Sequence, residues 1–316
     1  MRSLTMTGIL ATLVLLALAA LVSLRPGPSQ VVFAHANLAR AEPAPNSVLA
    51  QSPQWVRLWF TEPVEPGFSE IQVLNTLGQR VDKGDTTVDN ADPSSMSVSL
   101  PELPNGTYTV SWRNLSAVDG HPVRGSFVFS VGEVTGPVGE VPSEQPLLPH
   151  PLDPLFRWLV LLSGLAVVGG LGFYLLVANP ALKGKGPDQR LSYVNRLLTW
   201  LIVRLIWVSS VVFLVASAGQ LLVQTAVVHS IPLSQGFDPR HISSVVTDTN
   251  WGTLWLWRIA LLLALGLLVT VSVRRQPRPP RAGDKGPLNP LLAWAALLLG
   301  MGMLLTLSLV SDAAAT

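Results

Sequence analysis

The 316-residue sequence contains no cysteine, which excludes disulfides, thiolate metal sites, iron–sulfur clusters and thiol nucleophiles. Charged residues are also scarce, at 13% of the chain against about a quarter in ordinary soluble proteins. Hydrophobic residues make up 49% and are gathered in long runs. We therefore expect a chain that is partly embedded in a membrane and partly soluble.

The basic residues are concentrated beside hydrophobic runs. The segments 183–196 and 274–285 hold nine of the 21 Lys and Arg residues. By contrast, residues 35–133 carry 6 Lys or Arg against 11 Asp or Glu. This distribution is typical of membrane topology and not of a nucleic-acid-binding surface, so we expect no nucleic-acid partner.

The N-terminus has the pattern of a signal peptide. Arg2 is followed by a hydrophobic run of 16 residues, Ile9–Leu24, which is shorter than the roughly 20 residues of a comfortable membrane span. Cleavage after Val32-Phe33-Ala34 would remove residues 1–34 and leave His35 as the new N-terminus. The long spacer Arg25–Gln30 leaves an uncleaved anchor open as the alternative.

Residues 35–133 read as an all-β domain. Five segments mostly alternate apolar and polar residues, and turn-forming residues separate them; the segments are 55–60, 71–74, 96–100, 108–112 and 127–131. Short strands at regular spacing over about 100 residues predict an Ig-like β-sandwich.

A Pro-rich linker, 134–154, leads to an α-helical membrane domain, 155–316. Four apolar stretches can each cross a lipid bilayer as a helix: 155–178, 197–223, 251–273 and 288–311. The connections after the first and third stretches carry four and five basic residues, whereas 224–250 holds only Arg240. The positive-inside rule therefore predicts a multi-pass cell-membrane protein with its β-domain on the periplasmic or extracellular side.

Two histidines of the β-domain, His35 and His121, are candidate metal ligands because of the residues around them. A mature N-terminal His35 would offer its amine and its ring Nδ1 as a chelate, and Asp119-Gly120-His121 would add a carboxylate and an imidazole from a turn. Three nitrogens and one oxygen suit tetragonal Cu(II). Taken alone, Asp-Gly-His-Pro is typical of an ordinary turn.

The setting of these residues resembles the CopC copper-resistance family. The similarity is carried by the segments 34–38, 42–47, 53–64, 103–113 and 116–125. The resemblance implies a periplasmic or extracellular β-sandwich that binds Cu(II) through His35, Asp119 and His121. Some members have a second, methionine-rich Cu(I) site, but Met96 is the single methionine of residues 35–133, so we expect none here.

The membrane half resembles the CopD family, which usually has about twice as many membrane helices. This difference leaves two interpretations open. The membrane domain is completed by a second copy or a separate chain, or the reading frame is cut short.

Few polar groups lie in the predicted membrane helices. We expect Arg204 and Arg258 to reach the membrane interface by snorkelling. The second predicted membrane helix has four polar side chains on one face: Ser210, Ser217, Gln220 and Gln224. Hydrogen bonding between helices is the simpler explanation for their presence there. We expect His150, His229 and His241 to be surface histidines in exterior segments.

These observations favour a membrane-tethered copper-binding protein that acts in copper uptake, homeostasis or resistance. A copper-dependent oxidative enzyme is one alternative, but a carboxylate from Asp119 would occupy the position that an O₂ ligand needs, so we expect no enzyme. A structural Ig-like ectodomain on a membrane anchor is the other.

Overall fold

The computed structural model describes residues 36–132, 145–146, 151–182, 189–274 and 290–310. The predicted signal peptide 1–34, the predicted ligand His35 and His150 lie outside the described residues.

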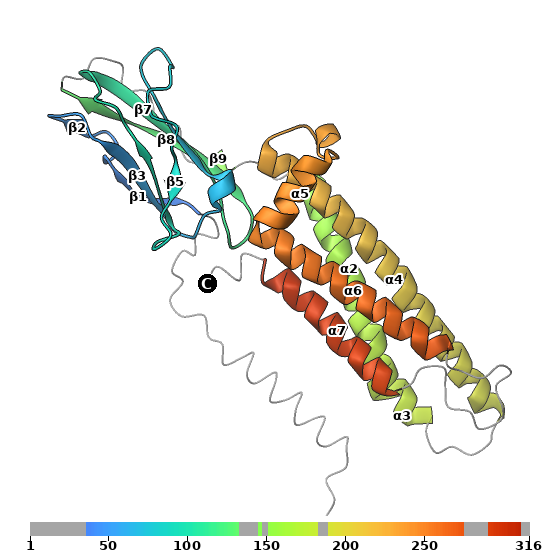
Figure 1. Ribbon diagram of the computed structural model, residues 1–316. Coiled ribbons are helices and arrows are strands. Elements are labelled where there is room, and N and C mark those ends of the chain that lie inside the picture. The colour runs from blue at the N-terminus through green and yellow to red at the C-terminus, as the bar shows by residue number, and fades with distance from the viewer. Residues whose placement is uncertain (1–35, 133–144, 147–150, 183–188, 275–289, 311–316) are drawn as a thin grey trace, which may run out of the picture. The chain divides into compact units, whose positions relative to one another are not determined.

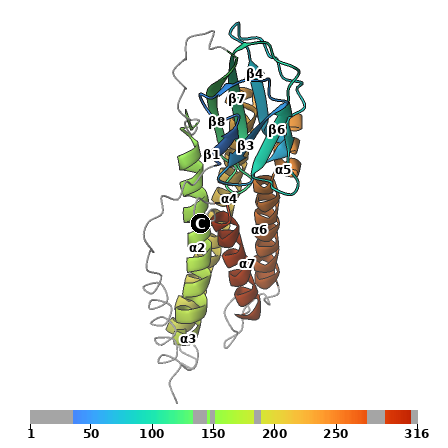
Figure 2. The same ribbon diagram turned by 90° about the vertical axis from the view of Figure 1, so that its left-hand side faces the viewer.

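The N-terminal part is a sandwich of two sheets, as predicted (Figure 2). One sheet has the order β1-β3-β6-β5, with β1 Leu38–Glu42, β3 Trp55–Phe60, β6 Ser95–Ser99 and β5 Thr87–Val88. The other has the order β2-β8-β7-β4, with β2 Val48–Leu49, β8 Pro122–Val131, β7 Gly106–Leu115 and β4 Glu70–Leu74. A short 3-10 helix, η1 (Pro66–Phe68), precedes β4.

The alternating pattern of the strands builds the core between the sheets. In β3, Val56, Leu58 and Phe60 are buried, while the residues between them are more exposed. They join Val110 of β7 and Phe129 of β8 in one apolar cluster. All five predicted strands are present, and they form because every second side chain can be buried against the facing sheet.

The Pro-rich segment is not entirely without secondary structure. A two-residue strand, β9 (Gln145–Pro146), pairs antiparallel with Val123 and Arg124 of β8. The first helix also begins at Asp153, within the range predicted as linker. Helix α2 thus includes the last two residues of the predicted linker, and the extended pairing of β9 is compatible with an extended linker.

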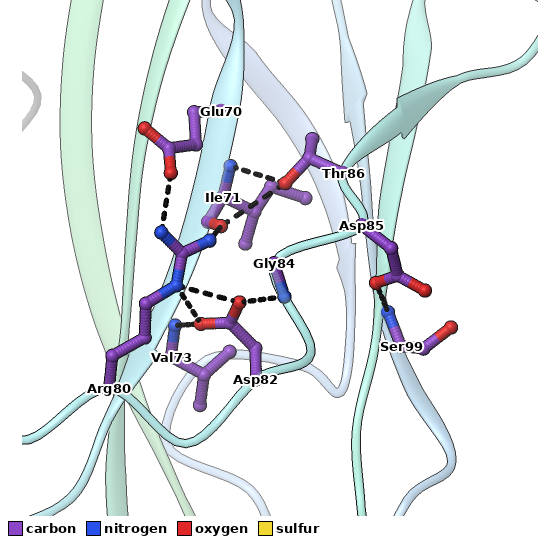
Figure 3. Close-up of polar contacts among 9 residues, drawn as sticks. All are labelled: Glu70, Ile71, Val73, Arg80, Asp82, Gly84, Asp85, Thr86 and Ser99. Atoms are coloured by element: carbon purple, nitrogen blue, oxygen red, sulfur yellow. Dashed lines mark hydrogen bonds and ion pairs between the residues drawn. The ribbon is translucent and has the colours of Figure 1, made fainter.

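An ion-pair network closes the loop that follows β4 (Figure 3). Asp82 Oδ2 accepts a hydrogen bond from Val73 N–H at 2.7 Å, and its Oδ1 accepts one from Gly84 N–H at 2.8 Å. Arg80 bridges the side chains of Asp82 and Glu70, at 2.9 and 2.6 Å. The Asp82 carboxylate thus replaces a strand partner for the backbone at the edge of the sheet.

The C-terminal part is helical (Figure 1). Among the described residues, four helical segments are long and apolar enough to cross a membrane: Asp153–Ala181, Tyr193–His229, Asn250–Val273 and Leu291–Ser308. The first comprises α2 (Asp153–Phe173), the π-helical η2 (Tyr174–Ala178) and α3 (Asn179–Leu182); the others lie in α4 (Gln189–His229), α6 (Asn250–Arg274) and α7 (Pro290–Ser308). α2 packs against α4 and α7, and α6 packs against α7.

Two features of the helices go beyond the predicted spans. At 1.5 Å per residue, the 41 residues of α4 extend about 60 Å, roughly twice the ~30 Å of a hydrocarbon layer. The connection after α4 contains the 3-10 helix η3 (Leu233–Gln235) and α5 (Pro239–Asp248), whose N-cap Asp238 accepts a hydrogen bond from Arg240 N–H.

Candidate metal centre

Asp119 and His121 lie in the turn that joins β7 and β8. These strands pair from Gly106 and Val131 up to Leu115 and Pro122, so the turn comprises residues 116–121. Ser116 Oγ accepts hydrogen bonds from the N–H groups of Val118 and Asp119. Its own hydroxyl donates to Oε2 of the buried Glu62 at 2.6 Å. Gly120 completes the turn with a φ of +72°, which favours glycine.

The carboxylate of Asp119 holds the ring of His121. Asp119 is buried, its Oδ1 accepts the His121 backbone N–H at 2.9 Å, and its Oδ2 lies 2.9 Å from His121 Nδ1. A carboxylate that orients an imidazole in this way is the usual surrounding of a histidine metal ligand. The structure therefore brings these two predicted ligands together.

The opposite nitrogen of the ring faces a cation. Arg157 Nη2, in the first turns of α2, lies 3.0 Å from His121 Nε2. A guanidinium only donates hydrogen bonds, so Nε2 must carry a lone pair and the proton of the neutral ring must be on Nδ1. That tautomer matches the contact of Nδ1 with Asp119, and it leaves Nε2 with the lone pair that a metal requires.

The described chain begins beside the same strand. Ala36 is fully buried, and its carbonyl oxygen accepts a hydrogen bond from Asn114 Nδ2 at 2.8 Å. Asn114 is two residues before the turn and pairs with Val123. Asn37 is held in turn by two hydrogen bonds with Thr61. The residue that precedes Ala36 in the sequence is the predicted ligand His35.

Asp119 and His121 provide two donor side chains, one oxygen and one nitrogen. Within the ranges that the structure describes, no group of three or more His, Asp or Glu side chains is arranged to hold a metal ion. The donors fit copper in kind, because imidazole and carboxylate both bind Cu(II), and a third donor must come from elsewhere.

The turn also contacts the helices. Gln224 Nε2 of α4 donates to Gly120 O at 2.7 Å, and Asn250 Nδ2 donates to Ala117 O at 3.1 Å. Apolar contacts accompany these bonds, since Phe68 and Leu115 belong to one buried cluster with five residues of the helical part and its C-terminal end: Leu221, Val228, Val245, Trp251 and Val310. Burial raises the pKa of the nearby Glu65 carboxyl, although Asn250 N–H donates to it and acts in the opposite direction.

Gln224 is the outermost member of the predicted polar face of α4, and the other three members are buried. Ser210 and Gln220 are each 8% exposed and Ser217 is 0% exposed. Ser210 Oγ, Ser217 Oγ and Gln220 Oε1 have no hydrogen-bond partner among the described residues. The expected hydrogen bonds between helices are therefore not made by these three atoms, and unpartnered polar atoms inside a bundle are costly.

The structure corrects the snorkelling prediction for Arg258. Its side chain is 2% exposed, and it donates from Nε to Thr306 Oγ1 and from Nη2 to Thr306 O, both at 3.2 Å. The prediction was wrong because Thr306, on α7, offers two acceptors inside the bundle. Arg204 is exposed and lies 5.4 Å from the centre of the Trp200 ring.

His229 and His241 are not isolated surface histidines, contrary to the prediction. Both are half-buried, and their ring centroids are 4.5 Å apart. His229 contacts Thr225 O through Nδ1 and Ser244 Oγ through Nε2. The sequence did not predict this pair, because His229 and His241 are twelve positions apart and come into contact only when α5 folds back on α4.

Comparison with known proteins identifies both parts of the chain. Residues 38–132 match the CopC domain, and residues 148–316 match the copper resistance protein D-like, N-terminal domain. The chain belongs to the copper resistance protein D-like family. It carries a CopC domain in front of its membrane helices, as the sequence motifs indicate.

The similarity to individual relatives extends over different shares of this chain. Copper transport protein CutJ of Bacillus subtilis (strain 168) is 32% identical over 246 residues, which are 77% of this chain and 42% of that protein. Protein YobA of Escherichia coli (strain K12) is 37% identical over 101 residues, 32% of this chain and 81% of that protein. The crystal structure of CopC from Methylosinus trichosporium OB3b is 35% identical and covers 32% of this chain and 97% of that chain, with a TM-score of 0.30.

The chain spans less than half the length of CutJ, and most of the length of YobA. The relatives whose names state a role are copper transport and copper resistance proteins, and those names describe no catalytic activity. These names agree with the expectation of a copper protein. Together with the four helices, the match of residues 148–316 supports a multi-pass membrane protein.

Proposed function

We propose that this protein binds Cu(II) outside the cytoplasm and serves copper uptake, homeostasis or resistance at the cell membrane. The observation that carries the proposal is the Asp119–His121 pair. A buried carboxylate fixes an imidazole at 2.9 Å so that the other ring nitrogen presents a lone pair. That is the arrangement of a histidine ready to ligate a metal.

The proposed ligand set is His35, Asp119 and His121. His35 is covalently joined to Ala36, which is held beside β7 by Asn114, and adjacent Cα atoms are ~3.8 Å apart. Its amine and ring would complete a tetragonal set with His121 Nε2. Asp119 supplies the oxygen ligand once one of its carboxylate oxygens turns away from His121.

We place the β-domain on the periplasmic or extracellular side. The β-domain precedes α2, whereas the basic connections follow α2 and α6, at the other ends of these helices. A loop rich in Lys and Arg stays in the cytoplasm, so the β-domain lies across the membrane from both basic connections. Completion of the membrane domain by a second copy or separate chain stays a prediction.

The helical part is proposed to receive the metal from the turn. Gln224 contacts Gly120 between the two proposed ligands of the turn. Along α4 follow the oxygens of Gln220, Ser217 and Ser210, which have no hydrogen-bond partner in the part of the chain that the structure describes. Weak oxygen ligands without partners suit transient passage of a cation better than storage.

The proposal is tested on the full chain, purified without chelator. We expect one bound copper per chain and an N-terminal sequence that starts at His35. We also expect His121→Ala or Asp119→Ala to lower the Cu(II) affinity by about tenfold or more, in competition with a chelator. His241→Ala is the matched control, because that histidine lies on α5 and should leave the affinity unchanged. Equal affinity of the wild type and His121→Ala would refute the site.

A further inference from the structure

The contact between Arg157 and His121 has a consequence for metal binding. Arg157 is fixed in position by Asp153, one turn earlier in α2, whose Oδ2 accepts from Arg157 Nε at 2.6 Å. Arg157 Nη2 then reaches His121 Nε2 at 3.0 Å. A permanent cation of the helical part thus occupies a lone pair of a proposed copper ligand.

A metal at either ring nitrogen breaks this contact. If copper binds Nε2, it takes the lone pair that Arg157 uses. If copper instead binds Nδ1, the neutral ring carries its proton on Nε2, and a guanidinium cannot donate to an N–H group. Moreover, Cu(II) on the ring would repel the guanidinium across a short distance in a partly buried site. Bound copper and the Arg157–His121 contact are therefore mutually exclusive.

The turn is shaped for close contact with the helices. A Cβ atom on Gly120 would lie 3.1 Å from Gln224 Nε2 and 3.2 Å from Trp251 Cδ1, which leaves no room for a larger residue without a shift. Gln224 also donates to the Gly120 carbonyl. The Arg157 contact thus belongs to an interface in which α2, α4 and α6 all contact one turn.

We propose that Arg157 is an internal competitor of copper, so that contact between the turn and the helices lowers the Cu(II) affinity of His121. This inference rests on the proposed function of His121 as a ligand and adds how binding there is regulated. Contact with the helices favours release of the metal next to Gln224, and loading of the metal favours separation of His121 from Arg157.

The test measures the Cu(II) affinity of the full chain in lipid nanodiscs by competition with a chelator. Arg157→Gln should bind Cu(II) about tenfold more tightly than the wild type or better, because a hydrogen bond from a charged donor no longer opposes the metal. Asp153→Asn, which loosens Arg157 without removing it, should shift the affinity in the same direction by less. The Cu(II) EPR spectrum should be the same in the wild type and Arg157→Gln, because Arg157 is not a ligand.

Arg240→Gln is the matched control. It removes one positive charge from an exposed side chain of α5 and should leave the affinity unchanged. An affinity of Arg157→Gln equal to or weaker than that of the wild type would overturn the competition, as would an equal gain from Arg240→Gln. His121→Ala separates the two proposals: if it loses Cu(II) binding while Arg157→Gln gains nothing, the site stands and the competition fails. If His121→Ala binds like the wild type, the proposed function itself is wrong.

Discussion

At the residue scale, the proposed copper site depends on a free amine. A neutral peptide nitrogen is a poor metal donor because its lone pair is delocalised onto the carbonyl, so His35 offers the chelate of amine and imidazole only when no residue precedes it. The chain that follows is fixed, because the buried Ala36 accepts a hydrogen bond from Asn114. An added residue would therefore displace the amine without changing any side chain of the site.

We expect one extra residue before His35 to abolish the chelate in the full chain. The Cu(II) EPR spectrum should change, and the affinity should fall by about tenfold or more. The native site should also weaken as the pH falls, since protons compete with the metal for the amine. An extra residue at the C-terminus is the control. An unchanged spectrum with the N-terminal extension would show that His35 binds through its ring alone or not at all.

At the scale of secondary structure, alternation identified the long strands but not the short ones. β3, β4, β6, β7 and β8 are each at least five residues long and bury mostly alternate residues over part of their length, which a local pattern can reveal. β2, β5 and β9 have two residues each, and their partners lie eight to 82 positions away along the chain. α5 was missed because its polar composition resembles that of a loop. Arg258 was misjudged because its partner Thr306 is 48 residues distant.

Like Asp82, Asp85 uses its carboxylate to hold a loop between two strands, and this contact predicts how the stability of the β-domain depends on pH. Asp85 accepts a hydrogen bond from Ser99 N–H at 2.9 Å, which, with Lys83 nearby, holds the pKa of its carboxyl below the usual ~3.9 (Figure 3). A lowered folded-state pKa stabilises the fold above about pH 4, and this contribution is lost as the pH falls through the folded-state pKa.

Asp85→Asn should therefore lower the Tm of a fragment of residues 35–133 at pH 7, and the difference from the wild type should shrink below pH 4. Such a fragment is a reasonable unit, because relatives such as YobA consist mostly of this domain. Thermal melting followed by circular dichroism at several pH values measures the difference. A difference that stays constant from pH 7 to pH 2 would mean that the charge of Asp85 does not stabilise the loop.

At the scale of the whole molecule, the sequence separated the two domains but could not reveal their contacts. Composition distinguishes a β-domain from apolar helices, and motifs identify the turn with Asp119 and His121. The contacts of that turn with Arg157 and Gln224 join residues 36 and 104 positions apart. No local pattern encodes such pairs, although the Gln224 side of α4 was recognisable as polar from its helical spacing.

The polar face of α4 tests whether the helices carry copper or only anchor the β-domain. Gln220 Oε1 is buried and has no hydrogen-bond partner among the residues that the structure describes, so Gln220→Leu should leave stability unchanged or raise it by about 1–3 kcal/mol. If the face conducts copper, the same substitution should reduce copper uptake by copper-starved cells, while Cu(II) binding at the turn stays intact. Thr225→Val is the control, because the Thr225 hydroxyl is buried but already bonded to Leu221 O within α4. It should not affect uptake.

A variant that is more stable yet transports less would identify Gln220 as functional, since a purely structural residue would not be retained at a cost to the fold. If residues 35–154 on an unrelated membrane anchor change cellular copper as much as the full chain does, the helices are only an anchor.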